Sequence, residues 1–219
     1  MIDITSFIDH TLLAPTSTYN DFKVLCEQAV KYGFYSVCVP PYMVKGCKQP
    51  LEKTDVKVCT VIGFPLGYNH FLTKEVEIKT AINNGADELD VVINISALKS
   101  KDFNYVQKEL EVLRKVSKDK ILKVIVETSY LSVEEKSKIA KIVLNSGADF
   151  IKTSTGFSTA GANIEDIKLF KSILKNNVRI KASGGIDSYE KAISFIKAGA
   201  NRLGTSKSLK IINNEKNNI

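Results

Sequence analysis

The sequence lacks several features that mark common classes of protein. Tryptophan is absent from the 219 residues, and only three of the 31 basic residues are arginines. Readout of bases and clamping of phosphates favour arginine forks interleaved with aromatic rings, so the composition disfavours a nucleic-acid-binding protein. The other basic residues are lysines scattered along the chain, and we interpret the net charge of +7 as a solvated surface whose field helps to attract an anionic small molecule.

Residues that hold metals or form disulfides are also scarce. None of the four cysteines belongs to a CxxC pair or has a histidine at metal-ligand spacing: Cys26, Cys38, Cys47 and Cys59. His10 and His70 are too few and too distant in sequence for a metal cluster, and neither belongs to a clear Ser-His-Asp arrangement. We therefore expect reduced thiols, no disulfide, no metal, and a core position for Cys38.

Long apolar runs are missing as well. No segment approaches the roughly 18 apolar residues that a membrane span needs, and the N-terminus MIDITSFIDH lacks a basic segment followed by a hydrophobic stretch. We expect no membrane partner, no secretion and a cytoplasmic location. With 44% hydrophobic and 25% charged residues, the chain is long enough for one domain with a sizeable core, and we assign residues 1–219 to it.

One pattern recurs along the chain. The stretches KYGFYSVCVP, NNGADELDVVIN, NSGADFIKTS and KAGANRLGTS each join a helical pattern to a short apolar run through a glycine. These glycines, at positions 33, 85, 147 and 199, are 52, 62 and 52 residues apart, about twice the length of one strand-loop-helix unit. A glycine directly after a helix supplies the left-handed conformation that ends it, and the apolar run that follows is typical of a buried strand. Another unit should therefore lie in each gap.

The gaps contain the missing units. Further β-rich runs occupy residues 57–65, 121–129 and 178–185, and FIDHTLL supplies a first short strand. Amphipathic helical stretches separate the runs: residues 71–84, 101–117, 132–145, 163–175 and 188–198. Eight strand-helix units in about 220 residues predict an α/β fold, a single-domain TIM (β/α)8 barrel, with residues 210–219 as a frayed polar tail. An open doubly wound sheet is the alternative fold, although no GxGxxG motif follows the first strand.

Polar residues interrupt the apolar runs at the strand ends where a TIM barrel places its catalytic groups. Lys152 lies in the sixth run, Lys181 in the seventh and Asp90 in the fourth. A lysine nucleophile must be unprotonated, and a second ammonium about 6 Å away at an effective dielectric near 20 contributes roughly 2.8 kcal/mol toward lowering its pKa. We therefore predict Lys152 as the nucleophile, Lys181 as the group that lowers its pKa, and Asp90 as the acid and base that moves protons. A structural ion pair is the alternative for Asp90, and Lys123, in the fifth run, is expected to point outward.

The loops after the seventh and eighth runs have a complementary composition. ASGGID and GTSKS offer closely spaced glycines and hydroxyls ahead of a helix, and TIM barrels often bind phosphate at this corner. The expected phosphate ligands are Gly184, Gly185, Gly204 and Ser206, joined by Thr155 and Gly156 from the KTSTG turn. GFPLG, at residues 63–67, is first of all a turn, but its place after the third strand would let it line a pocket.

Eight segments occur in the order of a known family: IDHTLL, VCVPP, GFPLG, GADELDVVIN, KVIVET, GADFIKTSTGF, IKASGGI and LGTS. With them the chain resembles the deoxyribose-phosphate aldolases over nearly its whole length. The resemblance implies a class I aldolase without metal or organic cofactor, which reversibly cleaves 2-deoxy-D-ribose 5-phosphate to acetaldehyde and D-glyceraldehyde 3-phosphate. It implies Lys152 as the Schiff-base lysine, Lys181 as the pKa-lowering lysine and Asp90 as the proton-transfer residue. The family's phosphate-binding turns fall on Gly156, Gly184, Gly185, Gly204 and Ser206.

One residue departs from the family pattern, because many members carry a small or hydroxyl residue where this chain has Lys207. The partner we expect is a phosphorylated sugar, and we also expect a homo-oligomer, either a dimer or a tetramer. A Schiff-base aldolase acting on another phosphorylated aldehyde or ketose is one alternative. A basic protein without enzymatic activity is the other, and it would bind nucleic acid in a salt-sensitive manner.

Overall fold

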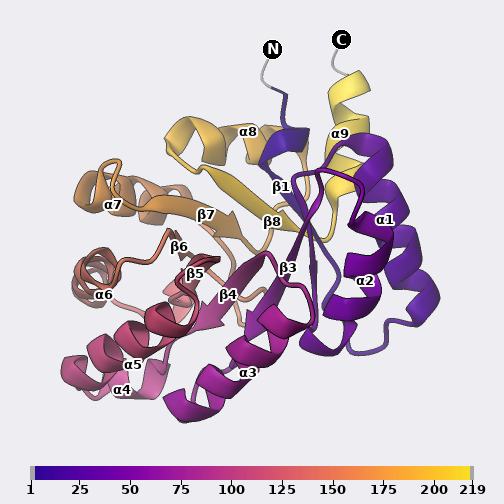
Figure 1. Ribbon diagram of the computed structural model, residues 1–219. Helices are drawn as coiled ribbons and strands as arrows, with labels where there is room; N and C mark the ends of the chain where they lie inside the picture. The colour runs from indigo at the N-terminus through magenta and orange to yellow at the C-terminus, as the bar shows by residue number, and fades with distance from the viewer. Residues whose placement is uncertain (1–2, 218–219) are drawn as a thin grey trace.

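Eight parallel strands form a closed barrel at the centre of the molecule, as the repeated units predicted (Figure 1). The computed structural model describes residues 3–217. Each strand pairs with the next along the chain and the eighth pairs with the first, which closes the ring and excludes the open sheet. The strands are β1 (Ile8–Thr11), β2 (Ser36–Val39), β3 (Lys57–Ile62), β4 (Glu88–Val92), β5 (Ile121–Ile125), β6 (Phe150–Lys152), β7 (Arg179–Ser183) and β8 (Arg202–Thr205).

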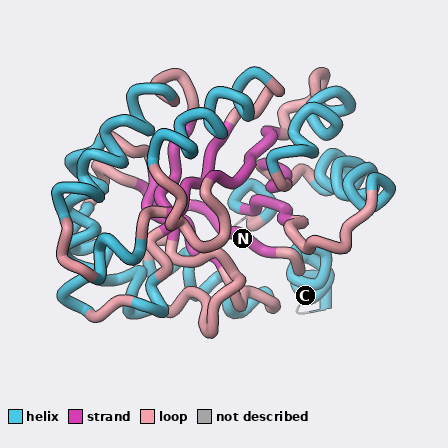
Figure 2. The backbone as a smooth tube through the Cα atoms, turned by 90° about the horizontal axis from the view of Figure 1, so that it is seen from below, coloured by secondary structure: helices cyan, strands magenta, loops and turns pink. Residues whose placement is uncertain are grey.

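Helices cover the outside of the barrel, so that the strands occupy the centre in Figure 2 and the helices its periphery. The α-helices are α1 (Tyr19–Tyr32), α2 (Val44–Leu51), α3 (Phe71–Asn83), α4 (Ile95–Lys99), α5 (Phe103–Val116), α6 (Val133–Ser146), α7 (Ile164–Leu174), α8 (Tyr189–Ala198) and α9 (Ser208–Asn217). The described residues also form three short 3-10 helices, of which the first precedes β1: η1 (Thr5–Phe7), η2 (Pro41–Met43) and η3 (Thr128–Tyr130). None of the helices within residues 3–217 combines the length and apolar character needed to cross a bilayer.

The helix ends follow from local sequence signals. The Thr18 hydroxyl accepts a hydrogen bond from the backbone amide of Asp21 at the start of α1, and the carboxylate of Asp21 accepts one from the Thr18 backbone amide. At the other end, Gly33 takes the left-handed conformation with φ +67°, which a residue with a side chain rarely adopts. The other three glycines of the repeat also have positive φ, so the predicted helix ends are confirmed.

The C-terminal segment differs from the prediction of a frayed tail from residue 210. Helix α9 continues to Asn217, and Ile211 and Ile212 are buried in the hydrophobic core. Two adjacent isoleucines bury enough apolar surface to fix the first turns of the helix against the barrel, which outweighs the polar residues that follow. Residues 218 and 219 of the predicted tail lie outside the described part of the chain.

The two faces of the strands are buried in different surroundings. Outward-facing residues such as Leu89, Val124 and Ile151 are apolar and belong to the core shared with the helices. Because side chains alternate along a strand, their neighbours face the barrel axis. Seven of these inward residues carry acidic or basic side chains and are buried: Asp9, Glu88, Asp90, Lys123, Lys152, Lys181 and Arg202. The barrel interior is therefore polar where the outer layer is apolar.

Candidate active site

Three lysine side chains converge on one carboxylate inside the barrel. Oδ2 of Asp90 accepts hydrogen bonds from Lys152 Nζ at 2.8 Å and from Lys181 Nζ at 2.7 Å. Oδ1 of Asp90 accepts one from Lys123 Nζ at 2.8 Å. The strand register explains the convergence, because Lys152 pairs with Lys181 between β6 and β7, and Asp90 pairs with Lys123 between β4 and β5. The sequence analysis had placed these residues in the sixth, seventh and fourth runs, and the structure brings their side chains together.

The orientation predicted for Lys123 is wrong. Its side chain points into the barrel, is fully buried, and also forms an ion pair with Glu88 at 2.6 Å. The run ILKVI is apolar on both sides of this lysine, so its periodicity did not reveal which face points inward. The pairing of β5 with β4 decides the orientation by placing Lys123 beside Asp90.

Three further charged side chains contact the lysines or one another, and the sequence analysis missed them. Asp9 forms an ion pair with Lys181, and its other oxygen accepts hydrogen bonds from Arg202 at 2.8 Å and from Ser36 at 2.6 Å. Arg202 also contacts Glu88 at 3.2 Å. Asp9 interrupts the run FIDHTLL as Asp90 interrupts its own run, whereas Glu88 and Arg202 are the first residues of their strands. The signal that singled out Asp90 would therefore have found Asp9 if it had been applied to every strand.

Positive and negative charges are not balanced among the seven buried acidic and basic side chains of the barrel interior, which we call the charged set. It contains four cationic side chains and three carboxylates, all of them buried. Lys123, Lys181 and Arg202 each contact two carboxylates, whereas Asp90 is the sole described carboxylate paired with Lys152 and is shared with two other lysines. Lys152 therefore has the fewest ion pairs of the four cations in the set.

Two of the groups around Lys152 hold their charge firmly. Burial alone would raise the pKa of Asp90, but the ammonium groups of Lys123, Lys152 and Lys181 outweigh it and hold the pKa well below the usual range. Burial likewise favours a neutral Lys181, yet Asp9 and Asp90 raise its pKa above the ordinary value. Near neutral pH, Asp90 is therefore anionic and Lys181 cationic, with fixed charges that act on Lys152.

A cavity of about 450 Å³ opens at the ends of β1, β6, β7 and β8, and Lys152 reaches its floor. Lys152 is the one member of the charged set that lines this cavity, with 4% of its side chain exposed compared with 0% for Asp90 and Lys181. All six residues predicted as phosphate ligands also line it: Thr155, Gly156, Gly184, Gly185, Gly204 and Ser206. The cavity thus joins the one accessible amine of the charged set to a wall rich in glycines and hydroxyls.

The glycines of this wall have different surroundings. A Cβ atom on Gly185 would meet no atom within 4 Å, so its backbone faces open space. A Cβ on Gly204 would lie 3.0 Å from Cε of Lys181 and 3.1 Å from Cβ of Ser183. Gly204 therefore leaves room for the Lys181 side chain, in addition to lining the cavity. A substitution there would act on the charged set as well as on any bound ligand.

Glu127 holds the loop after β6, and the sequence analysis did not identify it. This residue is buried and has a φ of +53°, which is uncommon for a residue with a side chain. Its carboxylate accepts hydrogen bonds from the backbone and hydroxyl of Thr155 and from the hydroxyl of Ser158 at 3.1 Å. Phe157, between them, lines the cavity and contacts Phe64 edge-on at 5.2 Å between ring centroids. Glu127 thereby fixes one side of the cavity mouth.

The GFPLG turn is held by a buried lysine on α3. Nζ of Lys74 donates to the carbonyl oxygens of Gly67 at 2.6 Å and Val92 at 2.7 Å, and pairs with Glu109 at 2.7 Å. Lys74 and Glu109 are fully buried, so the turn is fixed to the end of β4. Pro65 and Leu66 of the turn line a second, shallower depression of about 180 Å³ beside the first cavity.

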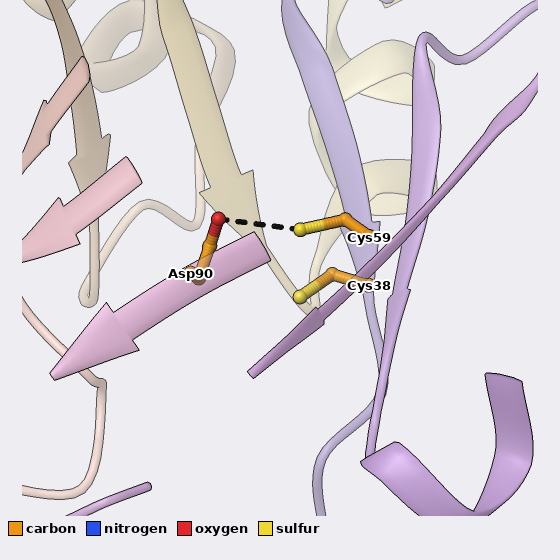
Figure 3. Close-up of side chains that lie close together, drawn as sticks. All are labelled: Cys38, Cys59 and Asp90. Atoms are coloured by element: carbon orange, nitrogen blue, oxygen red, sulfur yellow. Dashed lines mark hydrogen bonds between the residues drawn. The ribbon is translucent and has the colours of Figure 1, made fainter. Parts of the chain in front are cut away.

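Two thiols lie next to Asp90, as Figure 3 shows. Sγ of Cys59 donates to Oδ1 of Asp90 at 3.2 Å, and the ligand-type atoms of Cys38, Cys59 and Asp90 lie within 4.8 Å of one another. Asp90 already contacts three ammonium groups, and a metal ion would add further positive charge beside them. The charge of the surroundings therefore disfavours a cation here. Cys38 is buried, in agreement with the predicted core position.

Comparison with known proteins identifies the family. A family model described as the DeoC/LacD family aldolase matches residues 4–211. The chain belongs to this aldolase family. A deoxyribose-phosphate aldolase from Clostridioides difficile (strain 630) is 53% identical over 215 residues, which cover 98% of both chains. One from Thermococcus gammatolerans is 49% identical over 220 residues, covering 99% of this chain and 98% of the relative.

Solved structures agree with the assignment of this DeoC/LacD aldolase. A deoxyribose phosphate aldolase from Aeropyrum pernix, described as having a unique tetrameric structure, superposes with a TM-score of 0.91. It is 34% identical, and the match covers 99% of this chain and 92% of that one. The predicted TIM barrel and the predicted family are both confirmed.

Proposed function

We propose that the protein is a deoxyribose-phosphate aldolase that cleaves 2-deoxy-D-ribose 5-phosphate reversibly to D-glyceraldehyde 3-phosphate and acetaldehyde. The observation that carries this proposal is the position of Lys152, which alone among the lysines on Asp90 also lines the cavity. The names of relatives that are about half identical over nearly the whole chain support the same substrate. The charged set supplies the neighbouring positive charge and the carboxylate that an amine nucleophile requires. We therefore propose no metal or organic cofactor.

The reaction begins when the neutral amine of Lys152 adds to the C1 aldehyde of the substrate. Loss of water from the carbinolamine gives a protonated imine, whose C=N bond accepts an electron pair. The C3 hydroxyl then loses its proton, the C2–C3 bond breaks, and C3 leaves as the aldehyde of glyceraldehyde 3-phosphate. The two carbons that remain form an enamine, which takes a proton at C2. Addition of water releases acetaldehyde and restores the amine.

Asp90 and Lys181 have separate roles in this scheme. Asp90 accepts and returns protons, directly or through water, and its low pKa means that it passes a proton on rather than retaining it. Lys181 acts by its fixed positive charge, which disfavours a second ammonium at Lys152. Thr155, Gly156, Gly184, Gly185, Gly204 and Ser206 form the wall that receives the phosphate group.

Borohydride trapping combined with a cleavage assay tests the proposal. Acetaldehyde plus borohydride should modify Lys152, as read by peptide mapping, and glyceraldehyde 3-phosphate should form from deoxyribose 5-phosphate in a coupled assay. Lys152→Ala should lower cleavage by at least about a thousandfold and abolish the adduct. Modification of another lysine would refute the assignment of the nucleophile. Activity confined to other aldehydes in a panel of phosphorylated acceptors would instead point to a different substrate.

Three further features belong to the same proposal. We propose that the chain works as one domain, as a homo-oligomer of two or four copies, and in the cytoplasm. The tetramer described for the relative from Aeropyrum pernix supports the oligomer. Light scattering of the purified protein measures its state directly.

A further inference from the structure

The charges that line the main cavity are few. Among its described lining residues, Lys152, Lys207 and Asp187 carry charged side chains. Because we assign Lys152 to the chemical step, Lys207 is the remaining cationic side chain among these lining residues. It lines the cavity together with Gly185 and Ser206, and none of the three carboxylates of the charged set lines it.

Lys207 occupies a position that is unfavourable for a lysine in the absence of an anion. Helix α9 begins at Ser208, and the amide of Ile211 donates to the carbonyl oxygen of Lys207 at 3.1 Å. Lys207 is therefore the N-cap residue, where Ser, Thr, Asp or Asn would offer an acceptor that lysine lacks. Its charge also lies at the positive end of the helix dipole. A bound anion at this point would offset both costs.

The backbone of this corner is held in place. The amide of Lys207 donates to Oγ1 of Thr205 at 2.9 Å, and that hydroxyl donates to the carbonyl oxygen of Ile186 at 2.7 Å. These bonds join the loop after β8 to the loop after β7. An anion between the two loops would therefore meet a fixed backbone, beside the open space at Gly185.

The one carboxylate of the cavity lining does not cancel the charge of Lys207. Asp187, which precedes α8, forms an ion pair at 2.8 Å with Lys191 in the first turn of that helix. The same ammonium donates to the carbonyl oxygen of Gly185 at 3.3 Å. With Asp187 already paired, Lys207 leaves this corner with a net positive charge.

We propose that Lys207 is a specificity-determining residue that binds the phosphate group of the substrate, and that it gives the protein its preference for phosphorylated over unphosphorylated sugars. This inference rests on the proposed function. Ammonium and phosphate form charge-assisted hydrogen bonds, and the start of α9 supplies further donors next to the same anion.

Two variants, one at Lys207 before α9 and one at Lys210 within α9, isolate the effect of the Lys207 charge on phosphate binding. Lys207→Met should raise KM for deoxyribose 5-phosphate about tenfold, equal to about 1.4 kcal/mol, with kcat changed less than about twofold. The kcat/KM for unphosphorylated deoxyribose should stay within about twofold of wild type. Lys210→Met is the matched control, because it removes the same charge from an exposed position of α9 that does not line the cavity. It should leave both substrates unchanged.

Binding of inorganic phosphate provides a readout that does not depend on turnover. Titration of the intact protein followed by ³¹P NMR should show binding to wild type and to Lys210→Met, and at least fivefold weaker binding to Lys207→Met. Equal losses for both sugars, or unchanged phosphate binding in Lys207→Met, would overturn the proposal. If wild type bound phosphate through Lys207 but did not cleave deoxyribose 5-phosphate, the proposed substrate would be refuted and the phosphate-binding role of Lys207 would be retained.

Discussion

Replacing Lys181 by methionine should move the pH dependence of imine formation at Lys152 toward higher pH. Both ammonium groups contact Oδ2 of Asp90, at 2.8 and 2.7 Å, so their nitrogens cannot lie more than 5.5 Å apart. Two unit charges at that distance repel by about 3 kcal/mol at an effective dielectric of 20. One pH unit corresponds to 1.36 kcal/mol, so removal of Lys181 should shift the midpoint upward by about 2 units.

Single-turnover trapping with acetaldehyde and borohydride over a pH series measures this midpoint. Cleavage near neutral pH should fall by about a hundredfold in Lys181→Met, whereas trapping should recover as the pH rises. Lys152→Met should not recover at any pH, because no amine is left to form the imine. Circular dichroism checks folding, since Asp9 loses one of its two cationic partners in Lys181→Met.

Two outcomes would refute the reasoning. A folded Lys181→Met variant with the wild-type midpoint and rate would show that the charge of Lys181 does not act on the nucleophile. A folded variant that is never trapped, even at high pH, would assign imine formation to Lys181 itself.

Three other perturbations have expected outcomes. Gly204→Ala should lower kcat/KM by about tenfold or more for both phosphorylated and unphosphorylated deoxyribose, because the added Cβ would lie 3.0 Å from Lys181 Cε. Steady-state kinetics on both sugars measure this, and a loss confined to the phosphorylated sugar would contradict it. Glu127→Gln removes the negative charge that accepts hydrogen bonds from Thr155 and Ser158, and it should raise KM roughly fivefold. The pH midpoint of borohydride trapping should stay unchanged, and a shifted midpoint would show that Glu127 takes part in proton transfer. Asp9 and Asp90 have folded-state pKa values below the ordinary value, so their stabilising contribution is present above about pH 4 and is lost as the pH falls below it. A loss of about 2 kcal/mol at pH 3 would lower Tm by roughly 4–8 °C in calorimetry, and a Tm independent of pH between 3 and 6 would refute this assignment.

The fold could be predicted because its signals are local. Each repeat contains a helix, a glycine such as Gly33 that ends it in the left-handed conformation, and an apolar run. The predicted helix bounds agree with the structure within two residues. For example, the helix predicted at residues 163–175 is observed as α7, Ile164–Leu174. Local signals also place Lys152 at a strand end, and hence at the mouth of a barrel.

The parts that could not be predicted depend on contacts between distant segments. Lys123 lies in a strand that is apolar on both sides, so its inward orientation appears only with the register between β4 and β5. Asp9 and Arg202 meet because β1 pairs with β8 across the closure of the ring. The positive φ of Glu127 has no signature in its residue type, and the burial of Ile211 depends on the surface that α9 covers.

The closure of the ring has a consequence for moving this chemistry into another protein. The charged set draws on six of the eight strands, and the ion pair between Asp9 and Arg202 crosses the seam where β8 meets β1. Transplanting Lys152 and Asp90 alone into a different barrel would bury charges without their partners, at a cost of several kcal/mol for each. A transferable unit must therefore include the seam with Asp9 and Arg202. Circularly permuted variants with new termini in loops on the outer surface should, by contrast, keep the site. The contacts at the seam depend on the pairing of β8 with β1 and not on where the polypeptide starts.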